Sequence, residues 1–330
     1  MIREMVRTAV RSLLPASLAV LAAVLMLDPQ QIGAQSYSSG QPVWAAYEGW
    51  EKAADGAFDL LFGYMNDNWE EEIDVPIGPE NNIQPGGPDQ GQPAHFLPRR
   101  NRFIFRVHVP KDFGDKEMVW TLTTRGKTSK AYATLRTDYL IENIDIMSET
   151  GALGPGISDP VLRGDKAPAI RIEGEKSRRV KVGETLTLAA LVTDDGIPRV
   201  RAQQPPSAPP PGRAAAPAAA GPAPVPGRGP VFIPPARITV GKQMGLHVSW
   251  FVYRGAGNVT FEPQQIKIWE DTRTGTNSPW APQWVPPPLP ADGRWTSQVK
   301  FDSPGTYVLR ARADDGALAA DDDLTVTVTR

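Results

Sequence analysis

Residues 303–316 read SPGTYVLRARADDG. After a Pro-Gly turn, the apolar residues Tyr307, Leu309 and Ala311 fall on every second position until Asp-Asp-Gly gives another turn signal. This alternation predicts a strand with one buried face, because successive side chains of a strand point to opposite sides. The pattern recurs at residues 186–192, 246–252 and 324–328. Several short strands separated by turns favour a β-sandwich over a helical or parallel α/β fold.

The N-terminal half shows the same alternation. Apolar residues share alternate positions over residues 60–64, 73–77 and 103–109, and two further strands are expected at 119–124 and 130–135. Between them, residues 78–98 are rich in Pro, Gly and Asn, so we expect a long loop with little regular structure. Residues 43–146 are therefore predicted to form one all-β domain.

The composition of the chain changes at three further places. Residues 147–166 are rich in Gly and Pro and are predicted to be a linker to a second domain at 167–330. Within that domain, residues 205–230 are dominated by Pro and Ala and are expected to be disordered, because they cannot bury enough apolar surface. Residues 263–294 form a second insertion, rich in Trp and Pro.

Residues 1–34 have the order of a signal peptide. Arg3, Arg7 and Arg11 precede an apolar run over residues 13–27, and a small residue, Ala34, ends the segment. The apolar run is shorter than the ~20 residues of a spanning helix. We expect cleavage and a periplasmic or extracellular location. An uncleaved membrane anchor is the alternative, and membrane contact is expected only in that case.

Charge and composition exclude several classes of function. The formal net charge of −2 argues against a nucleic-acid-binding protein, which needs a basic surplus. The absence of Cys excludes thiol catalysis, disulfides and cysteine metal sites. Three scattered histidines, with no nucleophile elbow or phosphate-binding loop, leave no recognisable catalytic motif. Each His is expected to be a lone surface or strand-face side chain.

The second half resembles a known family in six strings that occur in the family's order: residues 183–188 (GETLTL), 192–198 (VTDDGIP), 248–250 (VSW), 257–261 (GNVTF), 303–316 and 324–328 (LTVTV). These strings are similar to PKD-like (polycystic-kidney-disease-type) immunoglobulin domains. The resemblance implies exported modules for adhesion, spacing or accessory binding, which are rarely catalytic. With the all-β first half, the chain is predicted to have two immunoglobulin-like β-sandwich domains and no cofactor other than the calcium considered below. Trp250 and Tyr307 are expected in the core, with the Tyr307 hydroxyl bound to the backbone of the preceding corner. The first half resembles exported bacterial proteins of unassigned function.

Acidic side chains are the candidates for chemistry. Asp-Asp-Gly at 194–196 and at 314–316, with a third acidic run at 321–323, place oxygen ligands suited to Ca²⁺ near the ends of strands. The candidate calcium ligands are Asp194, Asp195, Asp314, Asp315 and Asp322. The alternative is that these aspartates only form tight turns, which also favour Asp before Gly. Glycoside hydrolysis needs two carboxyl groups at a suitable separation, and Glu70, Glu72 and Asp74 are the candidates for such a pair. The simpler interpretation is that these residues form a solvated strand face.

Tryptophans supply the candidate binding surface, because a flat ring buries a large rigid area against a partner or a sugar. The candidates are Trp44, Trp50, Trp269, Trp280, Trp284 and Trp295. The alternative is that these rings cover the sandwich ends. The leading hypothesis is a non-catalytic envelope protein that binds or scaffolds another envelope protein or complex. A carbohydrate-binding module is the alternative, and a polysaccharide hydrolase ranks below both.

Overall fold

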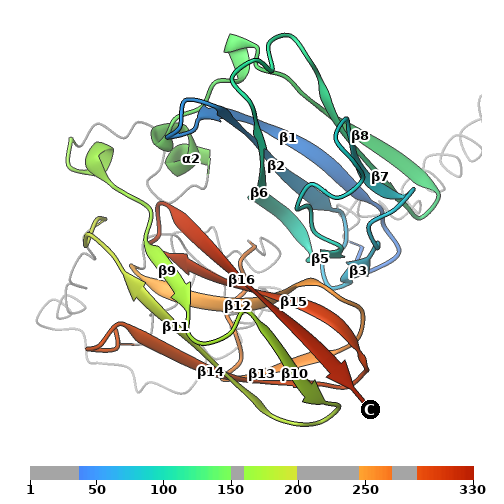
Figure 1. Ribbon diagram of the computed structural model, residues 1–330, viewed down its shortest axis with the longest axis vertical. Coiled ribbons are helices and arrows are strands. Elements are labelled where there is room, and N and C mark those ends of the chain that lie inside the picture. Colours follow the sequence, from blue (N-terminus) through green and yellow to red (C-terminus); the bar gives the residue numbers. More distant parts are fainter. Residues whose placement is uncertain (1–36, 150–159, 199–244, 270–287) are drawn as a thin grey trace, which may run out of the picture. The chain divides into compact units, whose positions relative to one another are not determined.

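The computed structural model describes residues 37–149, 160–198, 245–269 and 288–330, and Ser38–Arg330 form one compact unit. Almost all regular structure in these ranges is β-strand, which confirms the all-β prediction (Figure 1). The predicted signal peptide at 1–34 and the Pro/Ala-rich segment at 205–230 lie outside the described residues. No helix in the described ranges has the length and apolarity needed to cross a membrane.

The first sandwich is built from two three-stranded antiparallel sheets. One has the order β1-β2-β6 and the other the order β4-β7-β8, while β3 and β5 form a separate two-stranded ribbon. Strands β1, β2 and β6 correspond to strands A, B and E of an immunoglobulin-like domain, and β4, β7 and β8 correspond to strands C, F and G. The strands are β1 (Val43–Lys52), β2 (Phe58–Asn66), β3 (Ile73–Asp74), β4 (Asn81–Gln84), β5 (His95–Phe96), β6 (Arg99–Val109), β7 (Met118–Thr124) and β8 (Lys127–Ala133).

Most of residues 78–98 lies outside helices and strands, as expected, but the two short strands β4 and β5 lie within this segment. The buried Asn81 side chain donates hydrogen bonds to the carbonyls of Val75 (2.9 Å) and Pro93 (2.8 Å), and accepts one from the indole of Trp120 (3.0 Å). Hydrogen bonds from a side-chain amide to the backbone thus order a segment whose apolar residues do not alternate. For that reason the alternation of apolar residues did not predict β4 and β5.

Aromatic rings fill the centre of the first sandwich. Phe62 stacks on Phe105 with ring centroids 5.1 Å apart, and both rings meet the fully buried Trp120 edge-on. Each such pair adds about 1 kcal/mol beyond the burial of area. This core replaces the disulfide that the chain cannot form.

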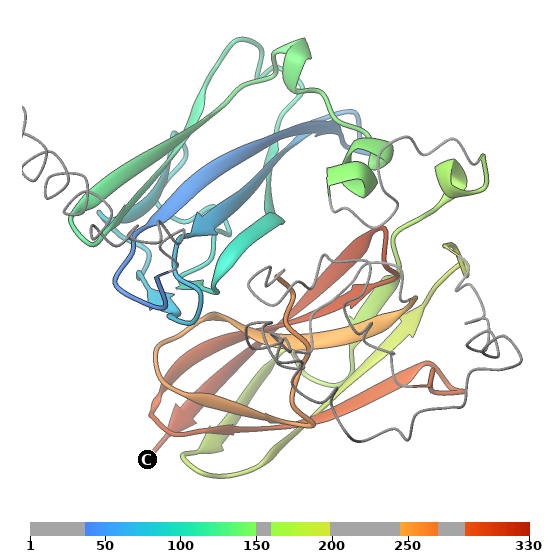
Figure 2. The same ribbon diagram turned by 180° about the vertical axis from the view of Figure 1, so that it is seen from behind.

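The second sandwich has two four-stranded sheets, with the orders β13-β14-β11-β9 and β10-β16-β15-β12. These correspond to the D-E-B-A and A′-G-F-C sheets of an immunoglobulin-like domain. Figure 2 shows β12 and β13, in orange, from behind. The strands are β9 (Ala169–Ile172), β10 (Ser177–Lys181), β11 (Leu186–Thr193), β12 (His247–Arg254), β13 (Val259–Glu262), β14 (Arg294–Phe301), β15 (Gly305–Asp314) and β16 (Ala319–Thr329).

Tyr307 and Trp250 occupy the core positions expected of them. The Tyr307 hydroxyl lies 2.9 Å from its acceptor Ser303 O at the preceding corner, as expected, and 2.8 Å from a second acceptor, Ala256 O, in the loop between β12 and β13. Trp250 lies inside the sandwich with aliphatic side chains around it. Both features are typical of immunoglobulin-like domains.

Strand β12 is buried on both faces. Trp250 and Val252 point into the second core, whereas Phe251 and Tyr253 join the core of the first sandwich. Arg254 makes a bidentate ion pair with Asp89, at 3.0 and 2.8 Å. The first core therefore includes side chains from both sandwiches, and the ion pair between Arg254 and Asp89 also joins them.

A short helix, α2 (Asn143–Glu149), was not predicted. Its residues Ile146 and Met147 are buried with Leu61 of β2 and with Ala317 and Leu318 of the β15–β16 turn. The boundary expected at residue 146 thus falls within this helix.

Candidate functional site

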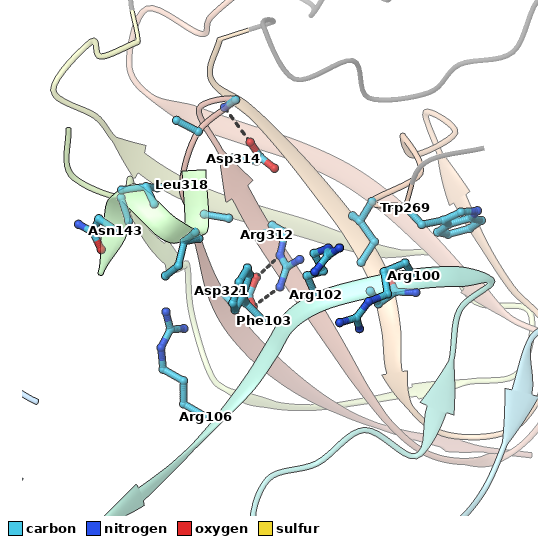
Figure 3. Close-up of a pocket in the computed structure, with 17 residues that line it drawn as sticks. Arg100, Arg102, Phe103, Arg106, Asn143, Trp269, Arg312, Asp314, Leu318 and Asp321 are labelled. Carbon is cyan, nitrogen blue, oxygen red and sulfur yellow. Dashed lines mark hydrogen bonds and ion pairs between the residues drawn. The ribbon is translucent and has the colours of Figure 1, made fainter. Parts of the chain in front are cut away.

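A cavity of about 250 Å³ opens between β6, helix α2 and the β15–β16 hairpin (Figure 3). Its wall combines guanidinium groups, carboxylates and apolar side chains. Figure 3 shows Arg100, Arg102 and Arg106 of β6. It also shows Arg312 and Asp321, and dashed lines join these two side chains. The residues that carry the argument below are Arg100, Arg102, Phe103, Trp269, Arg312 and Asp321.

Bulges in neighbouring strands shape the first wall of the cavity. On β6, Asn101 pairs with Tyr64 and Phe105 pairs with Phe62, so the three residues 102–104 lie opposite the single residue Gly63. Phe103 at the centre of this bulge has a φ of 51°, which a bulky side chain rarely adopts. Bulges re-aim side chains, and strained residues gather at functional sites. This bulge places Arg102 and Phe103 on the cavity wall.

A second irregularity, in β1, brings a carboxylate under these arginines. The register of β1 shifts between Tyr47 and Gly49, so Glu48 is the extra residue. The Glu48 side chain is 6% exposed, and Arg100 Nη2 donates to its Oε2 at 2.8 Å. The Nη1 atom of Arg102 lies 3.9 Å from the same carboxylate. Glu48 therefore orients two guanidinium groups from beneath.

Two cross-strand ion pairs join β15 and β16, and the pair between Arg312 and Asp321 lies on the opposite wall of the cavity. Arg312 makes a bidentate pair with Asp321, with both distances 2.7 Å, and Arg310 makes one with Asp323 at 2.7 and 2.8 Å. Burial opposes the charge of Arg312, but the charge and hydrogen bonds of Asp321 outweigh it and raise the pKa of Arg312. Both guanidinium groups thus stay charged and fixed in position.

The four tryptophans that the structure describes do not form one surface. Trp269 lines the cavity and packs against the first core, whereas Trp50 is itself buried in that core. The Trp44 indole donates to Asp67 at 2.6 Å, and Trp295 lies on β14 against the second core. Trp280 and Trp284 lie outside the described residues. Of the four described rings, Trp269 alone lines this cavity.

Four of the five predicted metal ligands form turns at the ends of strands. Asp194 accepts a hydrogen bond from Gly196 N (2.9 Å), and Asp195 from Ile197 N (2.9 Å). Asp314 accepts from Gly316 N (2.7 Å), and Asp315 from the amides of residues 317 (2.6 Å) and 318 (2.8 Å). Asp322 lies apart on β16, where it accepts from Ile172 N at 2.7 Å and pairs with Lys176.

A buried aspartate that the sequence did not single out, Asp165, belongs with these turns. Burial, with the charges of Asp195 and Asp194, raises the pKa of Asp165 to about 7, although the Lys166 amide partly offsets this. Burial likewise raises the pKa of Asp315 to about 8, with contributions from Asp165 and Asp314. Over the described ranges, no three His, Asp or Glu side chains already converge as metal ligands.

His95 is not the lone imidazole that was expected. It is 7% exposed, and its Nδ1 lies 2.7 Å from Asp74 and its Nε2 2.9 Å from Glu72. Burial alone would lower the pKa of His95, but the hydrogen bonds and charges of Asp74 and Glu72 outweigh it and raise the pKa to about 9. Glu72 and Asp74, which were expected on a solvated strand face, therefore hold the protonated His95 between them.

This clamp predicts a pH dependence of stability. The pKa of His95 is higher in the folded chain than the unfolded value near 6.5, so the clamp stabilises fully below about pH 6.5 and loses its effect as pH rises through about 9. Because both carboxylates are partly exposed, we expect a loss of about 2 kcal/mol over this interval. Urea denaturation at several pH values measures it. His95→Gln should make the profile shallower without flattening it, because the raised pKa values of Asp165 and Asp315 also lower stability as pH rises in this range. An unchanged profile in this variant would contradict the assignment.

The sequence analysis did not single out the arginines of the cavity. A signal was present in the run Phe103-Ile104-Phe105, where three successive apolar residues break the period of two. Such a break indicates either a bulge or burial on both faces. Arg100 and Arg102, which lie next to this run, then become candidates for a binding site at the bulge.

Comparison with known proteins does not identify a family. No protein-family model and no curated protein matches the chain. Among solved structures, the S-layer protein SbsC is 9% identical with a TM-score of 0.23, over 84% of this chain and 24% of that chain. The D00-D0 domain of intimin is 11% identical with a TM-score of 0.22, over 87% and 100% of the two chains. A titin Z1Z2 tandem is 11% identical with a TM-score of 0.20, over 86% and 93%. TM-scores this low carry no argument about function.

Proposed function

We propose that this chain is an exported, non-catalytic binding protein of the cell envelope that contacts a protein partner at the arginine-lined cavity. The observation that supports the proposal most directly is the chemistry of the wall, where Arg100, Arg102 and Arg312 lie with Trp269 and Phe103. Arginine and aromatic side chains are enriched at the centres of protein interfaces. A guanidinium fork fits a carboxylate, so the partner is expected to insert an acidic side chain.

Rigidity of the site supports binding by a preformed surface. The arginines are held by Glu48 on one wall and by Asp321 on the other, and the shared core fixes the two walls. A site whose side chains are already ordered loses less entropy on binding.

The proposed location rests on the sequence. The basic, apolar and small-residue order of residues 1–34 favours export, and the mature chain contains no Cys that export would oxidise. Within the immunoglobulin-like class, we assign the second sandwich to the PKD-like type from its GETLTL, VTDDGIP and SPGTYVLR strings.

Catalysis by the acidic residues near β3 is the weaker hypothesis. Glu72 and Asp74 both bind His95, so their charges already serve a structural contact. A hydrolase would need one carboxyl group as an acid and a second, free carboxylate across the scissile bond.

A photo-crosslinker at Asn143 tests the partner site in the native host. Asn143 is exposed at the cavity rim, and its replacement leaves the arginines intact. We expect a covalent adduct with one protein, reduced about tenfold by Arg102→Glu, because a reversed charge repels an acidic partner. Mass spectrometry of the adduct identifies the partner.

Two controls make this test decisive. A crosslinker at Tyr132, a 53% exposed residue of β8, should not give the adduct. Arg125→Glu, which reverses a charge outside the cavity, should not reduce it. Equal crosslinking from both positions, or no effect of Arg102→Glu, would refute the proposal. Binding to a glycan array with no protein adduct would instead favour the carbohydrate-binding alternative.

A further inference from the structure

A second and larger groove, of about 880 Å³, lies between the β3–β5 ribbon and the connection that joins β12 to β13. It is lined by residues 257–262, which include all of β13, by residues 250–252 of β12 and by the segment 264–269. Just before β5, Ala94 N donates to Tyr253 O at 3.2 Å, which holds the ribbon against the end of β12. The groove therefore runs along one side of the second sandwich.

Both sheets of the second sandwich end at this groove. Strand β13 is outermost in one sheet and β12 in the other, and Figure 2 shows both in orange. Among the described strands, none pairs with the outer side of either. Such an edge presents backbone N–H and C=O groups to a further strand. Gln265 covers part of the β12 edge, because its Oε1 accepts from Trp250 N at 2.9 Å, so β13 is the more open of the two.

The hydrogen bonds of β13 show which of its backbone groups face outward. Asn258 O accepts from Asp302 N at 3.2 Å, at the end of β14. The register between β13 and β14 is regular over residues 259–262. Because successive residues of an antiparallel strand alternate between bonded and non-bonded pairs, the N–H and C=O groups of Val259 and Phe261 point away from β14. These groups can bond to a strand added on the open side.

The charge of the groove indicates what such a strand carries. Four carboxylates and two basic side chains line the groove in the described ranges, namely Glu70, Glu72, Asp74 and Glu262, with His95 and Lys267. Even with both bases charged, the groove keeps a negative charge. It therefore attracts a basic segment, and it disfavours a second copy of this edge, which would bring the same carboxylates together.

We propose that an extended segment of a partner protein, with lysine or arginine at alternate positions, adds as a further strand along the outer edge of β13. The outward backbone groups of Val259 and Phe261 would bond to the segment, as in other cases of strand addition. Alternate side chains of a strand point to one face, so the basic residues can lie together in the groove. This surface is additional to the arginine cavity and does not depend on it.

Hydrogen exchange of the full chain, read by mass spectrometry, tests strand addition. The probe is a synthetic peptide of alternating lysine and valine at low salt, and a peptide of alternating glutamate and valine is its control. With the lysine peptide about tenfold above its Kd, exchange within residues 257–262 should slow about tenfold, because the amides of Val259 and Phe261 become hydrogen-bonded. The glutamate peptide should give no such protection.

Two variants test the contact through peptide affinity, measured by fluorescence anisotropy. Glu262→Lys reverses a charge on β13 and should weaken binding about tenfold. Val259→Pro should do the same, because it removes one outward N–H, and an edge strand tolerates proline where that N–H makes no ladder bond. Glu117→Lys is the matched control, an exposed carboxylate outside the groove, and should keep the affinity of the unmodified chain.

Several results would overturn the proposal. One is the absence of protection at residues 257–262, or equal protection by the glutamate peptide. Another is unchanged affinity in folded Glu262→Lys and Val259→Pro. Protection that grows with protein concentration without peptide would favour a second copy instead, and protection by a glucosamine oligomer alone would favour a glycan. Arg102→Glu should leave peptide binding unchanged, which separates this test from that of the arginine cavity.

Discussion

Replacing Arg310 by methionine is expected to lower the free energy of unfolding by about 3 kcal/mol. Arg310 is 8% exposed although it carries a full charge. Its guanidinium lies 3.5 Å from the ring centroid of Tyr253, and it donates to the Ile104 carbonyl of β6 as well as to Asp323. One side chain thus connects β15 with β12 and with the first sandwich.

The loss arises from the partners that Arg310→Met leaves behind. The Ile104 carbonyl would lose a charged donor, and the Tyr253 ring would lose its cation. Asp323 is 41% exposed and would be solvated, which keeps the cost below that of breaking a fully buried ion pair.

Urea denaturation of the full chain measures this effect as a shift in midpoint at constant slope. Arg106→Met is the control, because Arg106 is 44% exposed and pairs with Glu51 at the surface. We expect the control to cost less than about 1 kcal/mol. Equal stability losses in the two variants would contradict the role assigned to Arg310.

Gly63→Ala is expected to destabilise the chain by about 3 kcal/mol or more, through overpacking. A methyl group at this position would lie 2.5 Å from the Asn101 carbonyl oxygen and even closer to Glu48 Oε1. The Asn101 oxygen belongs to the backbone of β6, so the strand itself must move. The bulge that carries Arg102 and Phe103 would then shift with it.

Gly78→Ala provides the comparison, because nothing lies within 4 Å of the added methyl group there. We expect that variant to remain within about 1 kcal/mol of the parent. Gly63→Ala should also weaken crosslinking from Asn143 under conditions where the variant is folded. If Gly63→Ala left the free energy of unfolding unchanged, close packing of Gly63 against β6 would not constrain the cavity wall.

Several features followed from local sequence. Period-two alternation predicted β15 and β16, and the VSW string of β12 predicted a core tryptophan. The position of Tyr307 after a Pro-Gly turn predicted its corner hydrogen bond, which forms as expected. These features depend on residues close in sequence, where side-chain direction follows directly from strand geometry.

Other features depended on residues far apart in the chain. The segment 78–98 became ordered through Asn81, whose amide is bound by two backbone carbonyls and an indole. His95 acquired its carboxylate partners only because β5 pairs with β3. No periodicity records such contacts, since polar bonds to distant backbone leave no repeating pattern in the sequence.

By itself, the sequence determined that the chain forms sandwiches, because alternating apolar residues can be buried only by pairing strands into sheets. It also placed Asp-Asp-Gly turns at the strand ends. Tertiary structure alone decided that Phe251 and Tyr253 enter the neighbouring core, that Glu48 lies beneath two arginines, and that Asp165 joins the aspartate turns. The physical reason is that burial and charge act through space, and strand pairing sets which distant residues become neighbours.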